Sequence, residues 1–476
     1  MKARTPAAAG LALVLAACAS TGERGAPAAE LGAPQAAPAP PQLEIETRYA
    51  KLPNGLRVVM SKDASVPTAT VAVYYGIGFR IEPRDRTGFA HLFEHLMFQG
   101  SGNAPKGTFD NLIYRSGGVN NGSTRFDYTN YYEVVPSNAL EAVLWIEADR
   151  MARPVINQEV LVNQQGVVAN EVKVNVLNQP YGGWPWIDLP MLANENWYNS
   201  HNFYGELSDL EAATVEDAKQ FFDQFYRPNN AVLVVAGDID YDQTMAWVEK
   251  YFGAIAAGAP VTLPDISEPR QQQEKFRVRK DPLAPRPAYS FAYHMPERGS
   301  LEYYAMGLLD QILIQGADSR LNQKLVNERG VTGSVSGGIN LLGNMFNYNG
   351  PMLWAGAFVH DPAASREAIT AAIDEVIEDV RANGVTQAEL DRARTKLRSD
   401  FYGVVDSGTR FGLVDLLGSF ALFDDDPAKI NEIETGFAQV TPELIKATAQ
   451  EYLRPANRSV LVVEPAGPTA QQGKAQ

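Results

Sequence analysis

The chain has 476 residues, of which 45% are hydrophobic, and its formal net charge is −15 at pH 7. It is long enough to build two or more hydrophobic cores. Its acidic balance, without a stripe of clustered Lys and Arg, argues against nucleic-acid binding, and its single cysteine excludes a disulfide within the chain.

The N-terminus has the layout of a cleaved export signal. Lys2 and Arg4 precede a short apolar stretch, residues 7–15, which is followed by Ala16-Ala17-Cys18. The stretch is too short to span a bilayer. It resembles a bacterial lipoprotein signal, so we expect residues 1–17 to be removed and Cys18 to carry the lipid. An ordinary signal peptide with an incidental cysteine is the alternative.

Residues 18–42 are rich in Ala, Pro and Gly and contain too little apolar sequence to fold. They are therefore predicted to form a semi-extended tether. By the same lipoprotein resemblance, Ala19 after the cysteine favours delivery to the outer membrane. We expect a protein of the cell envelope that faces the periplasm and is attached to the membrane only by its lipid.

Strands are predicted at the start of the folded chain. Two runs, 43–52 and 56–62, flank Pro53-Asn54-Gly55, which is a hairpin signal. The later elements predicted in this half are a strand over 68–75, a helix from about Thr87, a strand over 124–135, and helices from Asn138 and about Ile156.

The first predicted helix contains His91-Leu92-Phe93-Glu94-His95. Residues three and four apart share one face of a helix, so the two imidazoles and the carboxylate converge. Two neutral imidazoles at this spacing suit zinc, and Glu94 is placed to take a proton from an attacking water. The order His-x-x-Glu-His is that of the inverted zincins; two buried structural histidines are the alternative. A third ligand is still needed, and with Cys18 lipidated it must be a histidine or a carboxylate.

The second half is predicted to begin with a strand at 286–293, followed by helices near 301–314, 364–382 and 387–402. It also repeats a pattern of the first half at a constant offset: a helix start, an Arg-Pro stop and an apolar strand. The matching residues are Thr214, Glu216, Arg227, Pro228 and Asn230 in the first copy and Thr441, Glu443, Arg454, Pro455 and Asn457 in the second.

The repeat indicates two homologous domains of the α+β class, each an antiparallel sheet covered by helices, in a clamshell arrangement. The predicted boundaries are 43–257 for the N-terminal domain with the motif, 258–285 for a linker rich in Pro, Gln and mixed charge, 286–466 for the C-terminal domain, and 467–476 for a disordered tail.

Three further sequence blocks accompany the motif segment Gly88–Gly100. They are Gly117–Asn121 with Thr124, Asp127, Thr129 and Tyr131, then Val167–Glu171, and then Asn178–Gly182. Together these blocks, within 43–466, resemble the pitrilysin family of zinc metallopeptidases, which includes insulin-degrading enzyme and the mitochondrial processing peptidases. The resemblance implies a two-domain clamshell that hydrolyses peptides inside an enclosed chamber.

The resemblance implies roles for three more residues. The family's third zinc ligand is a glutamate far along the chain from the second histidine, and Glu171 stands at the matching distance from His95 here. Gln164 stands where relatives often have a Glu that steadies the site, and it can still hydrogen-bond there. Asn121 and the strand after it resemble the edge strand to which a substrate adds as an extra strand; a turn before a strand is the alternative.

The second half has no His-x-x-Glu-His sequence, so one zinc ion per chain is expected. In self-sufficient relatives this half supplies an Arg and, seven residues on, a Tyr that hold the substrate carbonyl. The aligned residues here are Val326 and Gly333, and neither can donate a side-chain hydrogen bond. We therefore expect a heterodimer in which a zinc-less homologue supplies the Arg and Tyr, unless Arg320 or Arg329 substitutes.

The sequence thus predicts a zinc endopeptidase. Two alternatives stay open: a non-catalytic structural or peptide-binding subunit of the same fold, and a self-sufficient homodimeric peptidase. The remaining histidines receive no catalytic role. His201 is expected near the chamber wall or in a surface loop, and His294 and His360 are expected to be structural or solvated.

Overall fold

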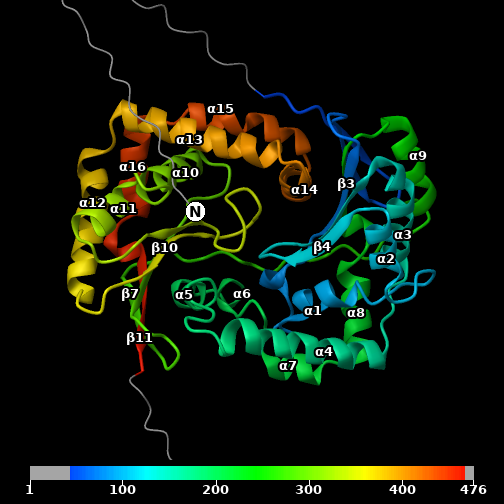
Figure 1. The fold of residues 1–476 in the computed structure, drawn as a ribbon, viewed down its shortest axis with the longest axis horizontal. Helices are drawn as coiled ribbons and strands as arrows, with labels where there is room; N and C mark the ends of the chain where they lie inside the picture. Colours follow the sequence, from blue (N-terminus) through cyan, green and yellow to red (C-terminus); the bar gives the residue numbers. More distant parts are fainter. Residues whose placement is uncertain (1–42, 467–476) are drawn as a thin grey trace, which may run out of the picture. The chain divides into compact units, whose positions relative to one another are not determined.

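The computed structural model describes residues 43–466, which form two sheets surrounded by helices (Figure 1). In spatial order the first sheet consists of β1 (Arg48–Lys51), β2 (Arg57–Lys62), β6 (Ala231–Gly237), β3 (Thr68–Tyr75), β5 (Thr129–Pro136) and β4 (Val119–Thr124). The second consists of β7 (Lys275–Asp281), β11 (Arg458–Pro465), β8 (Ala288–His294), β10 (Leu353–Val359) and β9 (Ser336–Ile339). The predicted segments 1–17, 18–42 and 467–476, with Cys18, lie outside the described residues.

The helices follow the same division. Those of the first half are α1 (Phe89–Leu96), α2 (Thr108–Arg115), α3 (Leu140–Ala152), α4 (Gln158–Val172), α5 (Asp188–Ala193), α6 (Trp197–Ser200), α7 (Leu207–Ala212), α8 (Val215–Phe225) and α9 (Tyr241–Phe252). Those of the second half are α10 (Leu301–Leu313), α11 (Arg320–Asn322), α12 (Arg366–Asn383), α13 (Gln387–Val405), α14 (Phe411–Asp424), α15 (Ile433–Ala438) and α16 (Pro442–Tyr452). Within 43–466 no helix has the length and apolar character that a bilayer crossing requires.

The predicted α+β class with two homologous halves is confirmed, because the two sheets repeat one topology. β6 and β11 are both central, and each pairs in parallel with one strand and antiparallel with another. Thr214 and Thr441 cap the helices that precede these strands, α8 and α16, by accepting backbone N–H groups. Val232 of β6 and Ser459 of β11 are separated in sequence by the same number of residues as the two threonines. They occupy equivalent positions in the strand pairing of the two sheets.

Two details differ from the sequence prediction. The run 124–135 is not one strand: β4 ends at Thr124, the chain turns, and β5 begins at Thr129. The predicted linker 258–285 contains β7, which pairs in parallel with β11, so each sheet has one parallel pair and is not purely antiparallel. β7 is an edge strand in which most residues are charged, and that composition resembles a linker.

Each half covers one face of the other half's sheet. Val58, Val71 and Leu233 of the first sheet face the helices of their own half. On the opposite face, Ala72, Val232 and Val234 pack with the second-half core, where α14 contacts β2, β3 and β6. In return, α5 lies on β7, β8 and β11, with Leu189 and Ala193 against Leu461.

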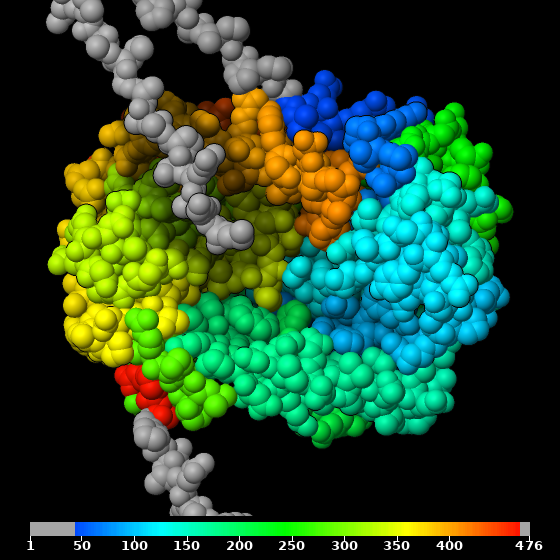
Figure 2. All heavy atoms as spheres, viewed as in Figure 1, coloured from blue at the N-terminus to red at the C-terminus, as the bar shows by residue number. Residues whose placement is uncertain are grey.

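The contact between α14 and the first sheet includes a buried polar cluster. Asp415 of α14 accepts hydrogen bonds from the Tyr128 hydroxyl at 2.8 Å and from the Tyr74 hydroxyl at 3.3 Å. Gly418, one turn further on, lies directly against the Tyr74 ring. Figure 2 shows the orange residues of this segment against the blue and cyan residues of the first half. The two halves therefore share one continuous core.

Replacing Gly418 with Ala tests this contact. An added Cβ would lie 2.6 Å from the Tyr74 ring, so Gly418→Ala is expected to lower the free energy of unfolding by about 1–3 kcal/mol through overpacking. Urea unfolding followed by circular dichroism measures the change. Gly403→Ala is the matched control, because Gly403 is also helical and has open space around its Cβ position. The control is expected to be stabilised by roughly 0.5–1 kcal/mol, and equal effects of the two substitutions would contradict the packing account.

Candidate metal centre

The motif lies on α1, a short helix whose N-terminus is fixed by a buried carboxylate. Its N-cap residue, Gly88, has φ +82° and offers no side chain to cap the helix. Instead, the backbone N–H groups of Gly88 and Ala90 donate to Glu82 at 2.8 and 2.6 Å. Gly88 is also required sterically, because a Cβ there would lie 2.4 Å from the Tyr204 carbonyl oxygen. Glu82 therefore sets the position and direction of α1.

Glu82 is itself held by His201. The His201 Nε2 lies 3.8 Å from Glu82 Oε2 and 2.7 Å from the Phe79 carbonyl oxygen, while Nδ1 lies 3.0 Å from the Trp197 carbonyl oxygen. Burial raises the pKa of Glu82, and the contact with His201 and the two backbone donors opposes that rise. His201 thus lies behind the motif helix in a structural position, not in an exposed loop.

Three side chains converge between α1 and the C-terminal turn of α4. His95 Nε2 lies 3.2 Å from Glu171 Oε2, and His91 Nε2 lies 3.7 Å from Glu171 Oε1. One potential ligand atom from each of the three residues falls within 4.8 Å of the others. The structure therefore brings together the three residues that the sequence and the resemblance assign to the metal.

The protonation states suit a cation at this place. Burial, followed by the neighbouring His95, lowers the pKa of His91 to about 4, which keeps its imidazole neutral. The hydrogen bond from His95 lowers the pKa of Glu171, which keeps it a carboxylate. Two imidazoles and one carboxylate form a donor set that a catalytic zinc ion uses. The residues present therefore fit zinc.

Glu94 lies beside this group but has a different environment. Burial raises the pKa of Glu94, and the Thr124 hydroxyl, which donates to its Oε2 at 2.8 Å, opposes the rise. Gly122 allows the close approach of β4, because a Cβ there would lie 3.1 Å from the Glu94 Cγ. The carboxylate is thus fixed by an edge strand and has a raised proton affinity, as a general base requires.

Tyr204 is a functional candidate that the sequence analysis did not single out. Its hydroxyl donates to Glu171 Oε1 at 3.2 Å, and its ring lies edge-on to His91 with centroids 4.9 Å apart. α4 continues past Glu171 into a π-helical turn, Lys173–Leu177, whose Asn175 also bonds the Tyr204 hydroxyl. The only sequence signal for Tyr204 was its place in the segment that follows His201.

The other predicted residues lie nearby with weaker contacts. Asn121 is exposed on β4, the edge strand of the first sheet, and its Oδ1 accepts from the Gly122 N–H at 2.9 Å. Gln164 is buried on α4 and donates to the Asn163 side chain. His294 lies between Asn194 and Asn457, and His360 is buried beside Asp361, so both occupy structural positions.

Comparisons with known proteins place the chain in a family. The family described as Insulinase (Peptidase family M16) matches residues 57–181, and the Peptidase M16 inactive domain matches residues 212–397. The chain belongs to peptidase family M16. The first match contains His91, His95 and Glu171, and the second lies mostly in the half without the motif. The predicted resemblance to the pitrilysin group is thereby confirmed.

Relatives of this M16 chain carry zinc protease names. Zinc protease PqqE from Helicobacter pylori is 25% identical over 87% of this chain and 92% of its own length. The crystal structure of a protease from Helicobacter pylori matches with a TM-score of 0.80, covering 89% of this chain and all of that chain at 23% identity. The periplasmic protease PqqL from Escherichia coli matches with a TM-score of 0.72 at 18% identity, over 90% of this chain and 48% of its own. The structural likenesses establish the shared fold.

Tyr204→Phe tests how the carboxylate is held. Loss of the hydrogen bond to Glu171 is expected to weaken zinc binding about 10-fold or more, as for other groups that orient a metal ligand. Competition with a chromogenic chelator measures the affinity. Tyr198→Phe is the control, because its ring packs against Trp197. Unchanged affinity in Tyr204→Phe would show that Glu171 does not depend on this contact.

Proposed function

We propose that this M16 chain is a zinc-dependent endopeptidase that hydrolyses peptides within an enclosed chamber. The observation that carries the proposal is the convergence of His91, His95 and Glu171, with Glu94 partly buried beside them on the same helix as the histidines. A subunit with only a structural role would have no need for a complete ligand set and an adjacent base. One zinc ion per chain would be held by these three residues.

The chain's own groups account for the proton transfers. Zinc, when bound, supplies Lewis acidity that activates a peptide carbonyl and a water molecule. Glu94 accepts a proton from the attacking water and returns it to the departing amine, so no net proton is gained or lost by the enzyme. Thr124 keeps the carboxylate oriented through its hydrogen bond. The exposed edge of β4, including Asn121, would pair with the backbone of an extended peptide.

The second half supports the proposal of a heterodimer. Val326 lies in the π-helical turn Gln323–Glu328, and Gly333 has open space around its Cβ position. Arg320 donates to Glu389 and Asp379, and Arg329 lies 3.4 Å from Glu375. Both arginines are thus engaged by acidic residues of their own half. A zinc-less homologous subunit would supply the Arg and Tyr that hold the substrate carbonyl.

The proposed location is the periplasm, with a lipid anchor at Cys18, so the substrates would be peptides of that compartment. The basic residues, the apolar stretch and the Ala-Ala-Cys sequence at the N-terminus support this location. A relative in fold, PqqL, is named as a periplasmic protease. We propose the outer membrane as the site of attachment because Ala19 follows the cysteine.

Glu94→Gln separates catalysis from metal binding. The substitution keeps size and shape, so the zinc content measured by mass spectrometry is expected to stay at one ion per chain. Cleavage of a quenched-fluorescent peptide library is expected to fall by about 10²–10⁴-fold, the contribution of a general base. Glu159→Gln, an exposed residue of α4, is the control. Cleavage at the unsubstituted rate in Glu94→Gln would contradict the assigned role.

Addition of the partner tests the division of labour. The purified chain alone is expected to bind zinc but to cleave peptides slowly. A zinc-less M16 homologue encoded in the same genome is expected to raise kcat by about 10²–10³-fold, the effect of an oxyanion-stabilising donor. Substitution of the homologue's Arg and Tyr by Leu and Phe is expected to remove the gain. Full Glu94-dependent activity of the chain alone would instead establish the self-sufficient homodimer or monomer.

A further inference from the structure

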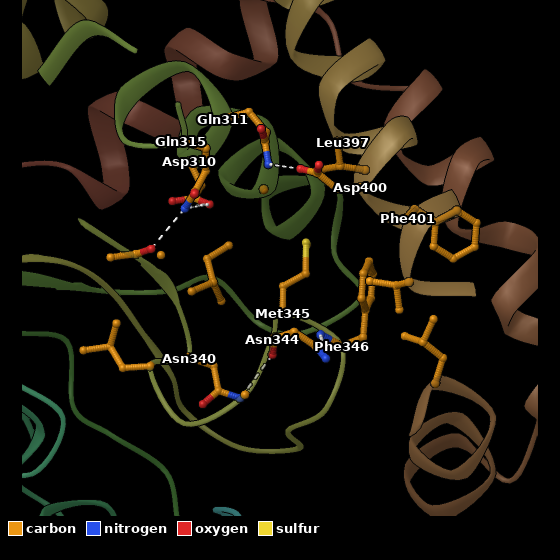
Figure 3. A pocket seen from close by; sticks show the side chains of 18 residues that line it. Asp310, Gln311, Gln315, Asn340, Asn344, Met345, Phe346, Leu397, Asp400 and Phe401 are labelled. Atoms are coloured by element: carbon orange, nitrogen blue, oxygen red, sulfur yellow. Dashed lines mark hydrogen bonds between the residues drawn. The ribbon is translucent and has the colours of Figure 1, made fainter. Parts of the chain in front are cut away.

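The second half contains a cavity of about 450 Å³ that the proposed reaction does not use. α10, α13, β9 and the segment after β9 form its walls (Figure 3). Asp310, Gln311 and Gln315 of the α10 side lie opposite Asn340 and Met345, and Asp400 of α13 lies beside Gln311. The cavity combines a polar end with a largely apolar lining.

The polar end is acidic, and the cation beside it, Lys396, lies outside the lining and donates to the Gln315 carbonyl oxygen at 2.6 Å and to Asp318 at 3.0 Å. Asp310 is only 8% exposed, and its carboxylate accepts from Trp354 Nε1 at 2.8 Å and from Gln315 Nε2 at 3.0 Å. Both donors are neutral. Asp400 accepts a long hydrogen bond of 3.5 Å from Gln311 Nε2. The residues that line the cavity include no Lys, Arg or His. The polar end therefore holds two carboxylates without an ion-pair partner in the lining.

A second observation also indicates a ligand with hydrogen-bond donors. Gln311 is 9% exposed, and its Oε1 is buried without a hydrogen-bond partner among the described residues. Burial of such an acceptor costs free energy unless a donor reaches it. Burial also raises the pKa of Asp310 to about 6, although the Trp354 and Gln315 donors and the charge of Lys396 oppose the rise. The lining itself thus supplies no cation to the two carboxylates and no donor to Gln311 Oε1.

The remaining walls suit an aliphatic stem. Met345, Phe346, Leu397 and Phe401 also line the cavity (Figure 3). A bare metal ion would gain nothing from these side chains, because hard cations prefer a shell of oxygen ligands. A long side chain with a charged end would bury its methylene groups there and place its charge at the carboxylates.

The position of the cavity in the fold favours a peptide as the source of that side chain. In the first sheet, three successive strand pairings connect Gly122 of β4 with Leu233 of β6. In the second sheet, three equivalent pairings connect Gly337 of β9 with Val460 of β11. Leu233 and Val460 are counterparts in the internal repeat, because they are separated by its constant offset. Gly337 of β9 is therefore the counterpart of Gly122, which contacts Glu94. The cavity adjoins β9 as the candidate metal centre adjoins β4.

We propose that this cavity binds the side chain of a lysine or arginine in a peptide, with its charged end at Asp310 and Asp400 and its stem against Phe346 and Leu397. The identification of the ligand as a peptide rests on the proposed function. It predicts that peptides with a suitably placed basic residue bind more tightly than neutral ones. The site is a place of substrate recognition in the half that has no zinc motif.

Binding is measured with the mature chain carrying Glu94→Gln, so that cleavage does not consume the ligand. The probe is the blocked peptide acetyl-Gly-Ala-Lys-Ala-Gly-amide. The comparison peptide has norleucine in place of lysine. Isothermal titration calorimetry gives the affinity, and 5-fluorotryptophan labelling, with Trp354→Phe to assign the signal, reports whether the ligand reaches Asp310. Asp310→Asn and Asp400→Asn remove the charges one at a time. Asp391→Asn, on the exposed face of α13, is the control.

The proposal predicts at least 10-fold tighter binding of the lysine peptide than of the norleucine peptide, with a shift of the Trp354 signal. Each cavity variant is expected to lose this preference, and Asp391→Asn is expected to keep it.

Asp400 is exposed, so Asp400→Asn remains informative if Asp310→Asn fails to fold. Equal binding of both peptides, or a preference that survives Asp400→Asn, would overturn the proposal. Binding of n-butylammonium as tight as that of the peptide would overturn the assignment to a peptide. Because these titrations need no turnover, their failure is distinguishable from a failure of Glu94-dependent cleavage.

Discussion

The contact between buried Glu82 and the N-terminus of α1 determines where the motif residues lie. α1 is short and begins at a glycine with positive φ, so its own sequence supplies no cap. A short helix with unsatisfied N–H groups is unstable in isolation. Glu82 satisfies two of these donors, and His201 lies behind the carboxylate. The positions of His91 and His95 relative to Glu171 therefore depend on residues that do not contact the metal site.

The exchange of helices between the halves provides the second constraint. The first sheet is apolar on both faces, and one of those faces is covered by α14 of the second half. Asp415 at that contact is buried, and its Tyr and Asn donors stabilise the carboxylate against the cost of burial. The second half thus contributes to the stability of the zinc-bearing half, even though it contains no zinc motif of its own.

The sequence predicted most of the elements that have strong apolar periodicity, including β3, α10 and α13, and the internal repeat predicted the common topology. It did not predict β4 as a separate strand, because Val-Asn-Asn-Gly-Ser-Thr has no apolar alternation. At the candidate site, helical spacing identified the two histidines and Glu94. Glu171 was found only through the family resemblance, because its contact with α1 is tertiary. Glu82 carries no local signal, and Tyr204 has only its place in the segment after His201, since the contacts of both residues depend on the tertiary fold.

The central claim is that His91, His95 and Glu171 hold one zinc ion. X-ray absorption at the zinc edge, on the mature chain reconstituted with one equivalent of zinc, tests it most directly. The account predicts two imidazole nitrogens with oxygen ligands completing the shell, and the loss of one oxygen contribution together with weaker binding in Glu171→Ala. A shell without imidazole, or a spectrum unchanged by Glu171→Ala, would contradict it.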